Sequence, residues 1–361
     1  MTEITFFIGF ILFIVAILAV DMFVIDKEAH VVSIKEAGIW TTIWIALALL
    51  FGVFLWFHGD MIHGISNLSE LQEVTNRYAS HINLTGVSFE RGVALYRENM
   101  AMDYITGYLI EKMLSVDNLF VMMMIFTSFQ VSNKEYQHVL NWGILGAIVM
   151  RCVFIFVGAA IISRFHWVLI VFGLVLIYSA IKMFMERDKK EQVDIQQQPM
   201  VRFMSRHFRI YPRFEGDKFF VRARKEGEQY VTATRSEGGR WYITPLMLTV
   251  AVIEFSDLIF AFDSIPAVFS VSLDPYVVFF SNIFAILGLR AMFFLLSAIA
   301  DRFRYLKTGV CLLLFFIGFK LLAGNFLHIS NLWSLAFILI VLTASILLSV
   351  MIPERKPQDQ K

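Results

Sequence analysis

The chain has 361 residues, of which 58% are hydrophobic and 17% are charged, and its formal net charge is +1. Its mean hydropathy is +0.68. This composition excludes an ordinary soluble globular domain. The balanced charge offers no basic footprint for nucleic acid, so we expect no nucleic-acid partner.

Apolar stretches long enough to cross a bilayer recur along the chain, since about 20 apolar residues span its hydrocarbon core. Nine stretches qualify, and they are residues 4–25, 38–57, 102–127, 138–160, 165–185, 244–270, 276–300, 308–323 and 332–352. The sequence therefore predicts an all-α, polytopic membrane protein. The first stretch has no preceding basic residue and no convincing cleavage site, which favours a retained helix over a signal peptide.

Lys and Arg residues predict the orientation of these spans. The loop 186–243 carries thirteen of them, so the positive-inside rule places it in the cytoplasm. With the spans alternating from there, the cytoplasmic side holds twenty-two and the opposite side only four. We therefore expect an outside N-terminus and a cytoplasmic C-terminus.

Two of the predicted spans contain clusters of acidic and polar residues. They read GYLIEKMLSVDNLFVMMMIF and LTVAVIEFSDLIFAFDSIPAVF. When the two are overlaid, Asp117 falls on Asp263. Six residues earlier, Glu111 falls on Asp257. An ionised carboxylate at bilayer depth costs at least about 2.5–3.5 kcal/mol, so an acidic pattern that occurs twice predicts a site for cations.

The match between the two regions continues to ILGAIVMR, which ends at Arg151, and to AILGLR, which ends at Arg290. We interpret residues 102–185 and 244–323 as two three-helix repeats. Because three spans is an odd number, the second repeat enters the membrane in the opposite sense, an arrangement typical of secondary transporters. The remaining regions are two leading helices with an outer polar segment (1–101), a cytoplasmic loop with a small β patch (186–243), and a final helix with a cytoplasmic tail (324–361).

The candidate ligands offer oxygen atoms and include no His or Cys. This chemistry suits a hard or borderline-hard divalent cation. The candidate metal residues are Glu111, Asp117, Asn118, Glu254, Asp257, Asp263 and Ser264. The residues expected to balance their charge when no metal is bound are Lys112, Arg151 and Arg290.

Helix geometry limits how these residues cooperate. Six residues rotate a helix by about 120° net, so Glu111 and Asp117 cannot easily hold one ion on a regular helix. In antiparallel repeats, we expect Asp117 to meet Asp257 and Glu111 to meet Asp263. Pro266 either breaks its helix and frees a carbonyl oxygen beside the site, or only kinks it.

Other classes of function remain open. Two intramembrane aspartates in contact would form a protease dyad, although the repeated arginines and extra acids exceed what a dyad needs. A scaffold would use the acids only in structural ion pairs. In the outer segment, we interpret His58, Asp60 and His63 as an ordinary polar helix end rather than a metal-binding patch.

Four motifs resemble the TerC/Alx family of bacterial integral membrane proteins. They are GYLIEKMLSVDNLFV at 107–121, GILGAIVMR at 143–151, TPLMLTVAVIEFSDLIFAFDSIPAVFSVSLDP at 244–275 and SNIFAILGLRAMFFLL at 281–296. The resemblance implies a bacterial inner-membrane exporter with Mn²⁺ as transported substrate and no organic cofactor. The long outer segment 58–101 departs from shorter members and leaves open a membrane or secretion-related protein partner.

On this hypothesis the aspartates matched between the repeats jointly build the ion path. Asp117→Asn and Asp263→Asn should then both abolish transport with expression intact. Glu111→Gln and Asp257→Asn should impair it less.

Overall fold

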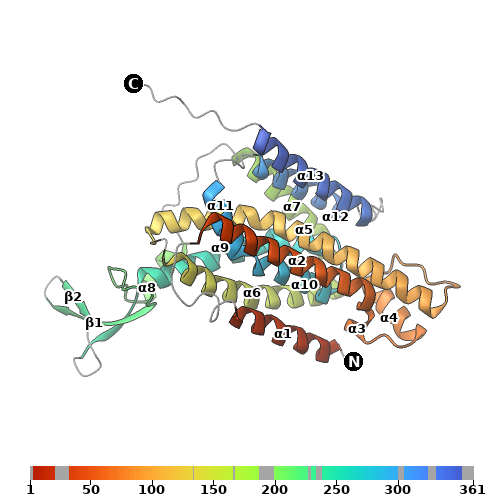
Figure 1. Cartoon of the computed structure of the whole chain (residues 1–361), viewed down its shortest axis with the longest axis horizontal. Helices are drawn as coiled ribbons and strands as arrows, with labels where there is room; N and C mark the ends of the chain where they lie inside the picture. Colours follow the sequence, from red (N-terminus) through yellow and green to blue (C-terminus); the bar gives the residue numbers. More distant parts are fainter. Residues whose placement is uncertain are drawn as a thin grey trace.

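The computed structural model describes residues 3–20, 32–132, 134–165, 167–186, 199–226, 229–232, 238–299, 305–323 and 331–351 (Figure 1). The helices before the sheet are α1 Glu3–Val20, α2 Ile34–His58, α3 Asp60–His63, α4 Leu68–Tyr78, α5 Phe89–Phe129, α6 Tyr136–Arg164, α7 Val168–Glu186 and α8 Pro199–His207. The strands are β1 Phe220–Glu226, β2 Gln229–Thr232 and β3 Arg240–Ile243. The helices after the sheet are α9 Pro245–Phe269, α10 Pro275–Leu287, α11 Leu289–Ile299, α12 Leu306–Ala323 and α13 Asn331–Met351.

Two proline-containing dipeptides determine where α9 and α10 begin. Thr244 caps α9 with its hydroxyl oxygen, and Pro245 is the first helical residue. Asp274 caps α10 by accepting a backbone N–H at 2.9 Å, and Pro275 follows it. A capping oxygen satisfies an N–H without a partner in the helix, and proline at the first position loses no helical hydrogen bond.

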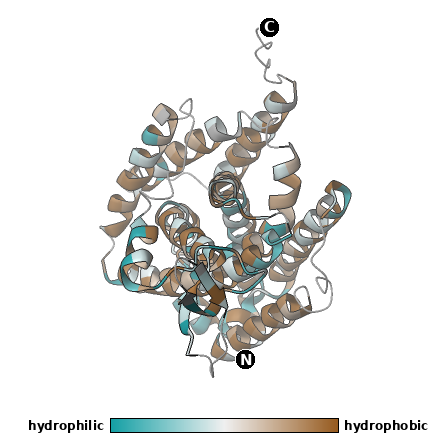
Figure 2. Ribbon diagram, turned by 90° about the vertical axis from the view of Figure 1, so that its left-hand side faces the viewer, coloured by the Kyte–Doolittle hydropathy of each residue, from teal (hydrophilic) through white to brown (hydrophobic). Residues whose placement is uncertain are grey.

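α5 is the central helix of the bundle. It has 41 residues, contacts α2, α9, α10 and α13, and runs along most of the bundle in Figure 1. α7, α12 and α13 form one side of the bundle, and α1 lies on the other side. Most helices consist largely of hydrophobic residues (Figure 2), and many large hydrophobic side chains of α1, α2, α6, α7 and α13 are exposed, as expected for helices in contact with lipid.

The described part of the chain has six helices long and apolar enough to cross a membrane, or seven if the bent pair α10–α11 is one span. These are α1, α2, α6, α7, α9 and α13. The two other predicted spans fall on α5 and α12. α5 carries several charged residues, and the apolar part of α12, Thr308–Ala323, is short. The last residues of the first predicted stretch, 21–25, lie outside the described residues.

The loop between α7 and α9 contains the predicted β patch. Its three strands form an antiparallel sheet in the order β2-β1-β3, which projects from one end of the bundle in Figure 1. β1 pairs with β3 through Phe220 and Ile243 at one end of their register. Residues 187–198 of this loop lie outside the described residues.

Pro266 does not break its helix. α9 continues through Pro266 to Phe269, so of the two alternatives left open by the sequence, the broken helix beside Asp263 is excluded. The interruption occurs at Gly288, where α10 and α11 meet at a bend of 45°. A Cβ atom at Gly288 would lie 2.8 Å from Lys112 Nζ and 3.1 Å from Trp44 Cβ, which explains why the smallest residue stands at the bend.

The close packing of α7 on α12 gives a test of the fold. A Cβ atom at Gly318 would lie 2.9 Å from the backbone oxygen of Gly173 and 2.8 Å from Ile177 Cγ1. Overpacking costs about 1–3 kcal/mol, so Gly318→Ala should lower the melting temperature of the purified protein. The matched control is Gly9→Ala in α1, where no atom lies within 4 Å. Equal melting temperatures for the two variants would contradict this packing.

Candidate ion site

Arg151 lies at the centre of a buried polar cluster. Its side chain, in the middle of α6, is 0% exposed. Nη1 donates to Glu111 of α5 and, at 2.7 Å, to Asn282 Oδ1 of α10. Nη2 donates to Asp257 Oδ1 of α9 at 3.3 Å. One guanidinium group thus connects three other helices, a task that suits its planar set of five N–H donors.

The two acids of this cluster are buried as deeply as the arginine. Glu111 is 0% exposed and Asp257 is 3% exposed. They come from corresponding positions of the two acidic motifs, so the structure joins matched residues across Arg151. With both carboxylates ionised, the three side chains carry a formal charge of −1, because one guanidinium faces two acids.

A stripe of buried polar side chains extends from Glu111 along α5. Tyr108, Glu111, Ser115 and Asn118 are spaced by three, four and three residues, which places them on one face of the helix. Tyr108 Oη, Glu111 Oε2, Ser115 Oγ and Asn118 Nδ2 make no hydrogen bond with any residue that the structure describes. Buried polar groups in membrane helices usually pair with one another or line an aqueous route. The stripe therefore places unsatisfied polar atoms next to Arg151.

α9 presents the corresponding face. Asp257 and Ser264 are seven residues apart, and Ser264 is 2% exposed. The Glu254 side chain lies against Gly146 of α6, where a Cβ atom would collide with its carboxylate. Among the described residues, Glu254 Oε1 and Ser264 Oγ have no hydrogen-bond partner. Polar oxygens of α9 thus face the same interior as the stripe on α5.

Asp263 lies apart from this cluster. Its Oδ1 accepts a hydrogen bond from Ser179 of α7 at 2.7 Å. The expected meeting of Glu111 with Asp263 is therefore wrong, because Glu111 pairs with Arg151 and Asp263 faces α7. The side chain of Asp117 is outside the described part of the structure, so its expected meeting with Asp257 stays a prediction. Helix rotation explains why Asp263 and Asp257 of α9 have different partners, because residues six positions apart point about 120° away from each other.

The other two basic residues contact polar groups near the bend between α10 and α11. Lys112 Nζ donates to the backbone oxygen of Ala285 at 3.3 Å. This carbonyl belongs to the last turn of α10, where helix carbonyls without a helical partner attract cations. Arg290 Nη1 donates to Asn141 Oδ1 of α6 at 2.9 Å. Lys112 thus caps a helix end, and Arg290 connects α11 to α6.

Among the described residues, no three His, Cys, Asp or Glu side chains converge closely enough to hold a metal ion. In the central cluster, a protein cation occupies the position between the two carboxylates. Binding of a metal by Glu111 and Asp257 together would therefore require the guanidinium group to move.

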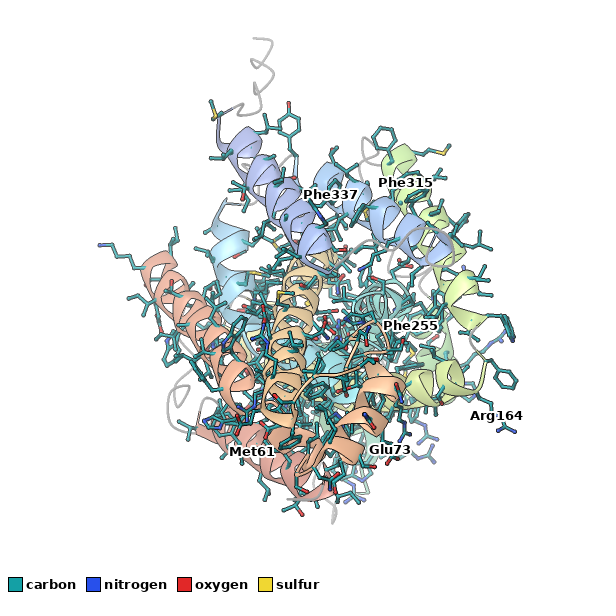
Figure 3. All side chains as sticks on the ribbon, turned by 90° about the vertical axis from the view of Figure 1, so that its right-hand side faces the viewer. Met61, Glu73, Arg164, Phe255, Phe315 and Phe337 are labelled. Carbon is teal, nitrogen blue, oxygen red and sulfur yellow. The ribbon has the colours of Figure 1, made fainter. Side chains whose placement is uncertain are left out.

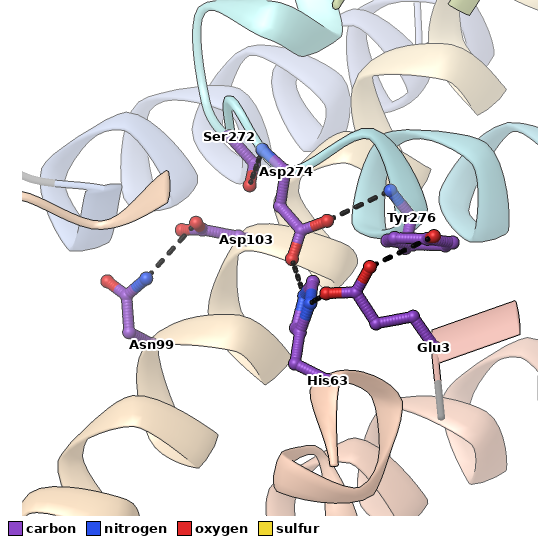
Figure 4. Close-up of polar contacts among 7 residues, drawn as sticks. All are labelled: Glu3, His63, Asn99, Asp103, Ser272, Asp274 and Tyr276. Carbon is purple, nitrogen blue, oxygen red and sulfur yellow. Dashed lines mark hydrogen bonds and ion pairs between the residues drawn. The ribbon is translucent and has the colours of Figure 1, made fainter. Parts of the chain in front are cut away.

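Several polar contacts were not anticipated from the sequence. Asn282 completes the central cluster, Asn141 holds Arg290, and Ser179 holds Asp263. The only signal for them is a polar residue within an apolar stretch. At the end of the bundle that holds residues 58–101, His63 contacts both Glu3 and Asp274 (Figure 4).

The side chains of His58, Asp60 and His63, in the predicted polar helix end, contact different partners. Asp60 accepts a hydrogen bond from Arg97 Nε at 2.6 Å, and the His58 ring lies 5.6 Å from the Phe54 ring. The three residues therefore have separate partners, and they do not gather around one point.

Apolar helices around a buried group of ionised side chains define a polytopic helical membrane protein. The sequence matches the integral membrane protein TerC family over residues 96–357, and the chain belongs to this family.

Relatives match nearly the whole chain. A Salmonella typhi protein named Alx (membrane-bound redox modulator) is 38% identical over 96% of this chain and 94% of its own length. The Escherichia coli K12 protein of the same name is 36% identical over 98% of this chain and 96% of its own. An uncharacterized membrane protein of Myxococcus xanthus is 37% identical over 97% of this chain and 93% of its own. No solved structure matches the chain.

The central ion pairs predict how Arg151 affects stability. Removing one partner of a buried ion pair typically costs about 3–5 kcal/mol, because the remaining charge is uncompensated. Arg151→Met should therefore lower the melting temperature and the yield of folded protein, measured by size exclusion in detergent. Adding Glu111→Gln and Asp257→Asn should restore much of the loss, since no buried charge remains in the cluster.

The control for this series is Arg164→Met, because Arg164 is exposed at the edge of the bundle (Figure 3). A melting temperature for Arg151→Met equal to that of Arg164→Met would contradict the assigned ion pairs.

Proposed function

We propose that the chain is a secondary transporter that exports Mn²⁺ from the cytoplasm, with Glu111 and Asp257 as the central carboxylates of its ion path. One observation carries this proposal: a fully buried guanidinium lies between two buried carboxylates from different helices. A protein cation balances one of the two acidic charges in this arrangement. A divalent cation has the charge to replace it, so Arg151 and the metal would occupy the site alternately.

The surrounding polar atoms support a hard or borderline-hard cation. Neutral oxygen atoms accompany the carboxylates. Asn118 and Ser264 follow Glu111 and Asp257 by seven residues on the same helices, and Asn282 shares the contact with Arg151. Oxygen ligands of this kind suit Mn²⁺, Mg²⁺ and Ca²⁺. The resemblance of the acidic motifs to the TerC/Alx family selects Mn²⁺ among them, and exchange of Ca²⁺ or Mg²⁺ is the alternative.

Reciprocal contacts support two inverted repeats. Arg151 of the first repeat donates to Asn282 of the second, and Arg290 of the second donates to Asn141 of the first. The arginines are matched positions, and the asparagines Asn141 and Asn282 lie ten and eight residues before the arginine of their own repeat. Two-fold related units exchange contacts in this reciprocal way. Alternating access would then arise from movement of one repeat against the other.

The proposed setting is the inner membrane of a bacterium, with nine spans, the N-terminus outside and the loop 186–243 in the cytoplasm. The distribution of Lys and Arg supports this orientation. Export would be driven by counter-transported protons or by the membrane potential. Carboxylates that bind metal must lose their protons, so metal and protons compete for the same oxygen atoms.

The rival classes receive less support from the geometry. A protease dyad requires two aspartates in contact that share a proton, whereas Asp257 contacts Arg151 and Asp263 contacts Ser179. A redox activity, suggested by the name of the Alx relatives, would need a reactive centre. Cys152 and Cys311 are free thiols, and Cys311 is buried in the bundle. We therefore favour a non-enzymatic transporter.

The structure changes the expected order of the acidic variants. Because Glu111 and Asp257 hold the central cluster, Glu111→Gln and Asp257→Asn should each reduce Mn²⁺ flux at least tenfold, a change in barrier of about 1.4 kcal/mol or more. Asp263→Asn should have a smaller effect, since Asp263 faces α7. The measurement is metal flux in proteoliposomes with a panel of Mn²⁺, Mg²⁺, Ca²⁺ and Zn²⁺.

The control variant is Arg164→Lys, which keeps an exposed charge at the edge of the bundle and should transport normally. Normal flux of every metal by Glu111→Gln and Asp257→Asn, with protein confirmed in the membrane, would reject the proposed path. Loss of flux with Ca²⁺ or Mg²⁺ as the preferred ion would keep the path and reject manganese.

A further inference from the structure

His63 lies between two carboxylates that come from distant parts of the chain (Figure 4). Its Nδ1 atom is 2.6 Å from Glu3 Oε1 of α1, and its Nε2 atom is 2.8 Å from Asp274 Oδ2 at the start of α10. The His63 side chain is 0% exposed, Asp274 is 4% exposed and Glu3 is 39% exposed. One imidazole ring therefore fastens α3 to both α1 and α10.

The two contacts require a protonated ring. An ionised carboxylate only accepts hydrogen bonds, and a neutral imidazole has only one N–H to donate. With an acceptor at each nitrogen, both nitrogens must carry a proton. The imidazolium is thus the form that donates a hydrogen bond to both carboxylates. After loss of one proton, the bare ring nitrogen would face a carboxylate oxygen with no hydrogen between them, and that contact would be repulsive.

Three tyrosine rings pack around the imidazole. The rings of Tyr78, Tyr96 and Tyr276 lie 5.3, 6.4 and 5.5 Å from the His63 ring. The titratable and charged groups that face His63 from the packed elements are Glu3 of α1, Arg77 and Tyr78 of α4, Tyr96 and Asp103 of α5, and Asp274 and Tyr276 of α10. On its own helix, Asp60 is engaged by Arg97.

The electrostatic balance agrees with this geometry. Burial acts to lower the pKa of His63, but the charges and hydrogen bonds of Asp274 and Glu3 outweigh it and raise the pKa to about 9 from 6.5. Such a difference corresponds to roughly 300-fold tighter proton binding in the folded protein than in the unfolded chain. The stabilisation is complete below the unfolded value near 6.5 and is lost as the pH rises through about 9.

The geometry of Glu3, His63 and Asp274 does not fit a metal site. Glu3 and Asp274 contact opposite nitrogens of the ring, so a single ion cannot touch both carboxylates and the imidazole. Solvent can reach the cluster from the Glu3 side, where a cavity of about 330 Å³ is lined by Glu3, Arg77 and Tyr276. A proton can therefore leave the ring by that route.

We propose that Glu3, His63 and Asp274 form a proton-dependent clamp, which holds α1 and the outer segment against the N-terminus of α10 and opens when His63 is deprotonated. The clamp is independent of the proposed transport activity, because it rests on contacts outside the central cluster. When the clamp opens, the contact between His63 and Asp274 at the start of α10 is lost, while the rest of the bundle stays folded.

The test is the melting temperature of the purified full-length protein between pH 6 and 10.5. The parent protein should be most stable below pH 7 and should lose several degrees with a midpoint near pH 9. His63→Gln should be less stable at pH 6.5, should show no such midpoint, and should converge with the parent above pH 10. Amide exchange in residues 3–20, corrected for pH, should rise in the parent over the same range.

A second variant keeps the test valid if His63→Gln does not fold. Glu3→Gln retains the shape of the contact and removes one charge, so the midpoint should move to lower pH. The matched control is His58→Gln, because His58 is exposed on the same part of the chain, and it should keep the parent profile. The proposal is overturned if the alkaline midpoint is the same in the parent and in Glu3→Gln, or if it persists in a folded His63→Gln protein.

Discussion

A charge inside an apolar bundle needs a partner of opposite charge within the bundle, and the cluster at Arg151 pairs one buried guanidinium with two buried carboxylates. The guanidinium of α6 is 0% exposed and contacts Glu111, Asp257 and Asn282 from α5, α9 and α10. Removing a charge from water costs several kcal/mol unless a partner is held in good geometry. The register of four helices is therefore tied to one side chain.

A cationic side chain between two carboxylates occurs at two places along the bundle. In the centre, Arg151 lies between Glu111 and Asp257, and nearer the N-terminal end of α10, His63 lies between Glu3 and Asp274. α10 takes part in both, through Asn282 at one level and through its capping residue Asp274 at the other. The far end of α10 meets Lys112 beside the bend at Gly288. A helix held at both ends by cations can respond to a change at either end.

Hydropathy predicted the long helices, because each predicted stretch overlaps a helix of the described residues, but it did not predict the short helices α3, α4 and α8. The pairing of side chains was less predictable, since it depends on helix rotation. Glu111 and Asp257 meet through the long side chain of Arg151, whereas Asp263 faces Ser179 of α7. α9 continues through Pro266, and the 45° bend lies at Gly288, between α10 and α11. The His63 contacts join residues separated by 60 and 211 positions, which no local pattern reveals.

The central claim is that Arg151 and a divalent cation are alternative occupants of the position between Glu111 and Asp257. The most direct measurement is a structure of the protein prepared with Mn²⁺, in which anomalous scattering locates the bound metal. The account predicts manganese within coordination distance of both carboxylates, at about 2.1–2.3 Å for such oxygen ligands, with the Arg151 guanidinium displaced. Manganese bound elsewhere, with Arg151 still bridging Glu111 and Asp257, would contradict it.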